Sequence, residues 1–161
     1  MKTRGLKMNY LLAPFGVLAV SLIGGYITGG NMDWYNTLNL PSFTPPGSFI
    51  GMVWTFIFIF FAISILLFSN NPKTDRKNLF FRIVVVLFVL NGILNVAWSY
   101  LFFGLHLIFW SVIEMLFLNL INLALILMLW KEHRASSILI MPYFIWVAFA
   151  TYLAYSIYLL N

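Results

Sequence analysis

The amino-acid sequence predicts an all-α integral membrane protein: a bundle of five transmembrane helices with a proline- and aromatic-rich loop between the first two. Of its 161 residues, 63% are hydrophobic and 8% are charged, whereas a soluble domain carries about 25% charged residues to face water. A spanning helix needs roughly 20 mostly apolar residues. Five stretches meet this requirement, at about residues 8–29, 48–69, 80–103, 107–130 and 137–159. The whole chain, residues 1–161, is the length of one domain.

The first apolar stretch could be taken for a signal peptide, because Lys2, Arg4 and Lys7 precede it. No Ala-x-Ala-like cleavage site follows, and the run continues directly through residues 24–30, so we expect a retained span. With five spans, the N-terminus shares one side of the membrane with the second and fourth loops.

The basic residues predict which side this is. All nine lie on the side of the N-terminus, namely Lys2, Arg4, Lys7, Lys73, Arg76, Lys77, Arg82, Lys131 and Arg134. The positive-inside rule therefore predicts a cytoplasmic N-terminus, with the loop at 30–47 and the C-terminus outside. This topology explains the net charge of +5, so we expect the partner to be the lipid bilayer and not a nucleic acid.

Several chemistries are excluded by composition. The chain has no cysteine, which rules out disulfides, thiolate metal sites and a cysteine nucleophile. Its two histidines, His106 and His133, lie at predicted helix ends, so the bundle has no Ser-His-Asp arrangement, no His-rich metal site and no axial haem ligand of the His or Cys type. We therefore expect no required cofactor, and a ligand held by stacking and shape.

Four of the predicted helices carry a stripe that contains a tryptophan. Residues at i, i+4 and i+7 share one helix face. The stripes are Trp54, Phe58 and Phe61; Asn91, Asn95 and Trp98; Trp110, Glu114 and Phe117; and Trp146, Ala150 and Leu153. Any single tryptophan could be an anchor at the membrane interface. Together with the polar Asn95 and Glu114, however, the stripes predict an aromatic pocket that opens toward the first loop and suits a flat apolar ligand.

Polar and small residues within the spans leave alternatives open. Glu114 is the only acidic residue within a span, so it needs a partner or a proton. It either orients a ligand or handles a proton, or it is a protonated partner of Asn95, Asn91 or a backbone carbonyl. Asn119 and Asn122 are expected to form interhelical hydrogen bonds. A stripe of small residues on the first helix permits close helix approach, against either a dimer partner or a neighbouring helix; its members are Ser21, Gly25 and Gly29.

The loop between the first two spans, WYNTLNLPSFTPPGSF at residues 34–49, is unusually rigid and aromatic for a connector. Its prolines Pro41, Pro45 and Pro46 fix φ and reduce the freedom of the unfolded chain. We expect this loop, residues 30–47, to cover the mouth of the bundle as a lid. The alternative is an interfacial aromatic belt on a stiff turn.

Three motifs in order resemble the TspO/MBR family of tryptophan-rich sensory proteins or translocator proteins over essentially the full length, and specifically its bacterial members. The first motif comprises Trp34, Tyr35, Leu38, Pro41, Phe43, Pro45, Pro46, Val53 and Trp54. The third span adds Leu94, Asn95, Trp98, Phe102, Phe103 and Gly104. The fifth adds Pro142, Tyr143, Trp146, Phe149 and Ala150, and the chain closes on Asn161.

The resemblance implies a dimeric bundle in a bacterial cell membrane. It would act as a receptor or carrier for tetrapyrroles (protoporphyrin IX and haem-type porphyrins) and for drug-like molecules such as isoquinoline carboxamides and benzodiazepines, in porphyrin homeostasis or stress sensing. The implied ligand-binding residues are Tyr35, Trp54, Asn95, Trp98, Trp110, Trp146, Ala150 and Leu153. The alternative is an enzyme that degrades protoporphyrin with light and oxygen, with Trp54 and Trp146 as reactive groups. A third possibility is a non-binding assembly or regulatory subunit.

Two positions depart from the family pattern. Ala154 stands where members commonly have Asn, so the pocket lacks one polar group and an identical ligand pose is not expected. The cholesterol segment proposed for animal members needs a basic residue after its tyrosine, but no Lys or Arg follows Tyr155. Cholesterol transport is therefore not implied.

Overall fold

The computed structural model describes residues 9–72 and 74–161 and contains five helices long and apolar enough to cross a membrane. They are α1 (Asn9–Gly29), α3 (Gly47–Asn70), α4 (Leu79–Ser99) with its continuation η1 (Tyr100–Gly104), α5 (Ile108–Glu132) and α6 (Arg134–Leu160). A short helix, α2 (Met32–Tyr35), lies in the first loop. The predicted five-helix, all-α membrane fold is confirmed, with most boundaries within one or two residues of those expected.

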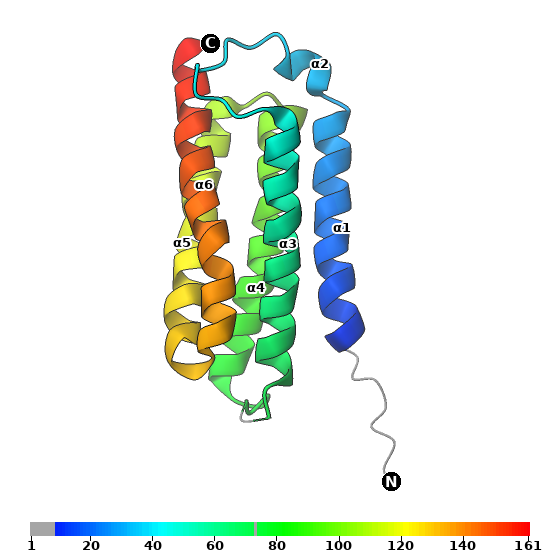
Figure 1. Ribbon diagram of the computed structural model, residues 1–161, viewed down its shortest axis with the longest axis vertical. Coiled ribbons are helices and arrows are strands. Elements are labelled where there is room, and N and C mark those ends of the chain that lie inside the picture. Colours follow the sequence, from blue (N-terminus) through cyan, green and yellow to red (C-terminus); the bar gives the residue numbers. More distant parts are fainter. Residues whose placement is uncertain (1–8, 73) are drawn as a thin grey trace.

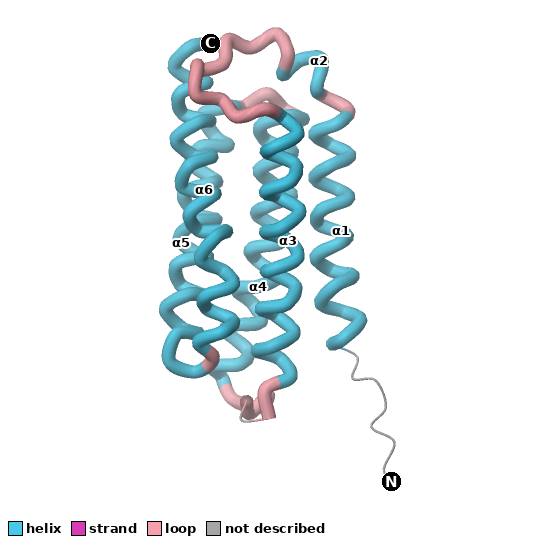
Figure 2. Tube along the Cα trace, viewed as in Figure 1, coloured by secondary structure: helices cyan, strands magenta, loops and turns pink. Residues whose placement is uncertain are grey.

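The helices form a single bundle whose two ends differ (Figure 1). Helix α6 packs against both α5 and α3, α4 packs against α5, and α1 packs against α3 and α4. At one end, α2 and the rest of the first loop pass over the helix ends and meet the C-terminus, as the loop segments in Figure 2 show. Only short turns join the helices at the other end. The first loop therefore covers one mouth of the bundle.

The boundary between α5 and α6 is sharper than the sequence indicated. The polar segment at 131–137 was expected to be a loop, yet α5 runs to Glu132 and α6 begins at Arg134. His133 is the one intervening residue, and its Nδ1 accepts a hydrogen bond from the backbone N–H of Ser136 at 3.3 Å. Because this side chain caps the first turn, α6 begins three residues earlier than the apolar pattern alone predicts.

Buried serines join the helices at the end far from the first loop. Ser64 of α3 and Ser136 of α6 each donate a hydroxyl hydrogen bond to the other's backbone carbonyl at 2.9 Å. Ser137 donates to the carbonyl of Ile126 in α5 at 2.7 Å. In a bilayer, where water cannot satisfy polar groups, such reciprocal bonds fix the packing of neighbouring helices.

The tight turn expected at residues 104–106 is present and begins inside the fourth span. The last turn of α4 widens into the π-helical η1, which is closed by a hydrogen bond from the Leu105 N–H to the Tyr100 carbonyl at 2.8 Å. A Cβ on Gly104 would lie 2.9 Å from Cδ2 of Tyr100, so any other residue here would force the Tyr100 ring to move. His106 then adopts a positive φ of 59° and reverses the chain. The wide turn places Phe102 and Phe103, both buried, beneath the first loop.

Candidate functional site: a cavity beneath the first loop

A cavity of about 920 Å³ lies within the loop end of the bundle. Its wall is formed by α1, α3, α4, η1 and α6, and its cover by α2 and the loop that follows. This volume is at the upper end of the range for small-molecule sites, and its mostly apolar wall with few polar groups is typical of such sites. The cavity can therefore accept a ligand larger than a single aromatic ring.

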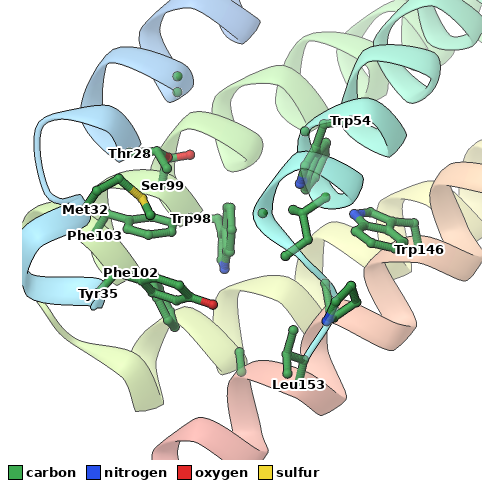
Figure 3. Close-up of a pocket in the computed structure, with 18 of the residues that line it drawn as sticks. Thr28, Met32, Tyr35, Trp54, Trp98, Ser99, Phe102, Phe103, Trp146 and Leu153 are labelled. Carbon is green, nitrogen blue, oxygen red and sulfur yellow. The ribbon is translucent and has the colours of Figure 1, made fainter. Parts of the chain in front are cut away.

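Three tryptophans from three helices surround this cavity, as Figure 3 shows. Trp54 of α3 and Trp98 of α4 are stacked, with ring centroids 6.0 Å apart. Trp146 of α6 contacts Phe49 and Phe149, with centroid distances of 6.3 and 5.4 Å. The cavity is thus bounded by indole surfaces against which a flat ring system can stack.

Two of these tryptophans have an unused hydrogen-bond donor. The indole Nε1–H groups of Trp98 and Trp146 are buried and have no acceptor among the described residues. Buried donors in folded proteins are nearly always paired, and leaving one unpaired costs about 1–3 kcal/mol. Both N–H groups are therefore unsatisfied donors in side chains of the cavity wall, and a ligand reaches them only when the atoms that cover them shift.

Asn95 is a buried polar residue of the cavity wall, with 4% of its surface exposed. Its Nδ2 donates a hydrogen bond to the hydroxyl of Tyr143 on α6 at 2.8 Å. Tyr143 in turn packs edge-on against Trp54, with ring centroids 5.9 Å apart. This bond fixes the rotamer of Asn95 and ties α4 to α6 behind the tryptophans.

All the predicted site residues except Trp110 line the cavity; they are Tyr35, Trp54, Asn95, Trp98, Trp146, Ala150 and Leu153. The Trp110 side chain is 59% exposed on the outer face of α5, and no residue of that fully described helix lines the cavity. The residues of this predicted stripe do not share one environment: Phe117 is also exposed, at 58%, whereas Glu114 is buried, at 8%. Helical spacing groups these three residues, but it does not determine which way the group points.

Glu114 does not form the hydrogen bond to Asn91 or Asn95 that was one expectation. Asn91 donates instead to Oδ1 of Asn122 at 2.8 Å, which confirms the interhelical role expected for Asn122. Both carboxyl oxygens of Glu114 are buried and without a partner among the described residues. The same holds for Oδ1 of Asn119, whose expected interhelical bond is not formed.

The small residues of α1 face the cavity. Ser21, Gly25 and Gly29 all line it, and a Cβ added to either glycine would meet nothing within 4 Å. These small side chains therefore leave space in the cavity. No helix in the described part of the chain packs closely against the two glycines.

The loop is held over the cavity by aromatic contacts. Trp34 stacks on His106 with ring centroids 3.9 Å apart. Tyr35 packs against Phe102 and Phe103, with centroid distances of 6.3 and 5.6 Å. Burial raises the pKa of the Tyr35 hydroxyl, so this group stays protonated at neutral pH and can donate a hydrogen bond into the cavity. The expected position of the loop over the bundle mouth is thus observed.

A second attachment involves residues that sequence reasoning did not connect. The side chain of Asn161, the last residue, pairs with the backbone of Asn39 in the loop: Oδ1 accepts from the Asn39 N–H at 2.9 Å, and Nδ2 donates to the Asn39 carbonyl at 3.1 Å. We call this pair the Asn161 clasp.

Phe102 and Phe103 also line the cavity, although they were not among the predicted site residues. The sequence did contain a signal for them, because both belong to the family motif that ends at Gly104.

The chain is similar in sequence to known proteins over most of its length. The model of the TspO/MBR family matches residues 12–160. The chain is 39% identical over 156 residues to "Tryptophan-rich protein TspO" of Bacillus cereus, covering 97% of this chain and 99% of that protein. It is 30% identical to the membrane protein YtaB of Bacillus subtilis (91% and 96% covered) and 27% identical to "Translocator protein" of Homo sapiens (94% and 87% covered). The five apolar helices and the full-length match together show that this integral membrane protein belongs to the TspO/MBR family.

Proposed function

We propose that the protein binds tetrapyrroles, such as protoporphyrin IX and haem-type porphyrins, in the cavity beneath the first loop. Aromatic drug-like molecules such as isoquinoline carboxamides would occupy the same space. The observation that carries the proposal is a cavity of about 920 Å³ walled by Trp54, Trp98 and Trp146. A flat macrocycle gains from stacking on indole rings and from leaving water. A receptor or carrier role in porphyrin homeostasis or stress sensing follows from such binding.

The remaining wall residues orient the ligand. The free indole N–H groups of Trp98 and Trp146 would donate to acceptor atoms of the ligand, while Asn95, held by Tyr143, keeps a fixed amide at the wall. Ala150 and Leu153 supply apolar contact from α6. Ala154 at the cavity wall has no polar group, whereas members of the family commonly have Asn at this position. The orientation of the ligand therefore depends more on the indole N–H groups and on the amide of Asn95.

The binding proposal is tested by titrating protoporphyrin IX into the purified protein and following its Soret absorbance. We expect saturable binding to the wild type and weaker binding to Trp146→Phe, which keeps a ring but loses one donor. A net hydrogen bond of about 0.5–1.5 kcal/mol corresponds to a loss of roughly two- to tenfold. Trp110→Phe is the matched control, since that indole is exposed away from the cavity. No saturable binding, or equal affinities of the two variants, would refute the proposal.

A photo-oxidative reaction on bound protoporphyrin is the second candidate. Trp54 lies in the cavity wall and is stacked with Trp98 at 6.0 Å, so a light-excited ligand would lie next to readily oxidised indoles. A non-binding assembly subunit remains the outcome if neither binding nor light-driven loss is found.

The setting we propose is a bacterial cell membrane, with a homodimer as the assembly, a cytoplasmic N-terminus and an outer loop. The basic residues Arg76, Lys77, Lys131 and Arg134 lie at the end of the bundle opposite to the first loop (Figure 1). This distribution supports placing the cavity mouth on the outer side.

A further inference from the structure

The cavity has an exposed side as well as a covered mouth. Among the residues that the five long helices and η1 contribute to its lining, the exposed ones all belong to α1 or α3; they are Gly25, Gly29, Gly47, Gly51 and Thr55. The lining residues of α4, η1 and α6, which are fully described, are buried or half-buried. The cavity is therefore closed by α4, η1 and α6, and it reaches the surface between α1 and α3.

Small residues keep this side open. Residues four positions apart lie on the same helix face, which groups Gly25 with Gly29 on α1 and Gly47 with Gly51 on α3. A Cβ built on any of these four glycines would meet no atom within 4 Å among the described residues. The result is an opening between the two helices that extends about 12 Å along α3, from Gly47 to Thr55, at a rise of about 1.5 Å per residue.

Gly25 and Gly29 can also be reached from outside the bundle. Both line a second, shallow hollow of about 530 Å³ at α1. Tyr26 lines this hollow too and is 86% exposed, so the hollow lies on the outer surface. Because the same two glycines line the inner cavity and the outer hollow, only backbone separates the two at this point of the wall.

The opening faces the hydrocarbon layer of the membrane. It is formed by the last turns of α1 and the first turns of α3, both within segments long and apolar enough to cross a bilayer. Its neighbours Met52 and Phe56 on α3 are exposed. The hydroxyl of Thr55 donates back to the Gly51 carbonyl of its own helix at 2.9 Å, so it presents no unsatisfied donor to lipid. An apolar molecule in the bilayer therefore meets an apolar rim.

The route from water, by contrast, is covered. Above the cavity, Trp34 stacks on His106, Tyr35 packs against Phe102, and the Asn161 clasp holds the loop. A flat apolar molecule also concentrates in the bilayer, because its apolar surface leaves water there. Both the structure and the partitioning of such a ligand favour the side opening.

We propose that the cavity takes its ligand from the hydrocarbon layer, through the opening between α1 and α3. The ligands that fit this route are flat, mostly apolar molecules that dissolve in a membrane and pass edge-on between two helices. The first loop is the segment that joins α1 to α3, so loosening the loop lets these helices part and widens the same opening. This inference rests on the proposed function, because it describes how a ligand of that cavity arrives.

The test closes the opening with leucine side chains. The double variant Gly25→Leu and Gly51→Leu places one on each side, and the helices should stay folded because leucine favours a helix more than glycine does. Gly16→Leu is the matched control: Gly16 is also an exposed glycine of α1 with nothing within 4 Å of its Cβ, but it does not line the cavity. Each protein is reconstituted in phosphatidylcholine vesicles, and stopped-flow tryptophan quenching follows the association and release of protoporphyrin IX.

We expect association and release to slow by the same factor in the double variant. This factor is roughly tenfold, because each passage must push two leucine side chains out of their preferred rotamers. The Kd should stay near that of the wild type, since one barrier serves both directions. Unchanged rates, a change confined to one of the two rates, or equal slowing in Gly16→Leu would overturn the proposal.

Quenching by lipid gives a readout that needs no porphyrin. The exposed Trp110 and Trp130 are first replaced by Phe, so the remaining emission comes from tryptophans that line the cavity or lie in the loop above it. Vesicles with brominated acyl chains should quench this emission, and adding Gly25→Leu and Gly51→Leu should reduce the quenching. Equal quenching with and without the two leucines would overturn the opening itself. Reduced quenching without any porphyrin binding would instead refute the proposed function, and with it the passage of porphyrin.

Discussion

Removing the Asn161 clasp should make the first loop open more often and release the ligand faster. Asn161→Ala deletes both strong contacts to Asn39, the bonds of 2.9 and 3.1 Å, which bridge residues 122 apart in the sequence. The helix itself loses only the bond from Asn161 to the Ile157 carbonyl in its last turn. We therefore expect the bundle to keep its fold.

The size of the effect follows from the two bonds. Each would contribute about 0.5–1.5 kcal/mol net, and both lie at an exposed position, which favours the lower end. A total of about 1 kcal/mol corresponds to a roughly fivefold larger open fraction of the loop. If ligand leaves only from the open state, its release rate rises by the same factor.

The assay is stopped-flow release of protoporphyrin IX, combined with amide hydrogen exchange at Asn39. Ser156→Ala is the matched control, because that hydroxyl bonds only to Tyr152 within α6. Faster exchange with unchanged release would show that the loop does not gate the cavity. Unchanged exchange would show that the clasp does not hold the loop in the first place.

Two further predictions concern chemistry and topology. If the protein degrades protoporphyrin in light and oxygen, the double variant Trp54→Phe and Trp146→Phe should lose most of the Soret bleaching; a wild-type rate would exclude these indoles as reactive groups. Because the chain has no cysteine, single-cysteine variants can report sidedness. A membrane-impermeant thiol reagent added to intact cells should label Ser42→Cys but not Lys77→Cys, and the reverse pattern would invert the proposed orientation.

The bundle could be predicted because the bilayer restricts the choices. In lipid, every backbone polar group must be satisfied internally, so a long apolar run forms a helix. Tertiary packing then needs only to arrange five such helices. The stop at His133 could not be predicted in the same way, since its capping bond to Ser136 is a local side-chain geometry that an apolar pattern does not contain.

The candidate site was predictable in composition but not in orientation. Trp98 shares a predicted helix face with Asn95, Trp146 shares one with Ala150, and Trp54 shares one with Phe58. All three tryptophans line the cavity. Trp110 shares a face with Glu114 by the same rule, yet it points outward. The rule gives relative angles within one helix, whereas the direction of the core depends on which neighbours α5 packs against. The clasp between Asn39 and Asn161 was hidden for a related reason, because it exists only once the bundle is assembled.

Buried polar groups have different roles at the two ends of the bundle: at one end they hold helices together, and at the other they surround the cavity. At the end far from the first loop, Ser64 and Ser136 satisfy each other reciprocally, which holds α3 to α6 with or without a ligand. Around the cavity, the indole N–H groups of Trp98 and Trp146 have no acceptor among the described residues, and an unpaired buried donor costs about 1–3 kcal/mol. A ligand that offers acceptors to both recovers that cost when it binds. A ligand that binds only the folded bundle should therefore stabilise the fold as well as occupy the site.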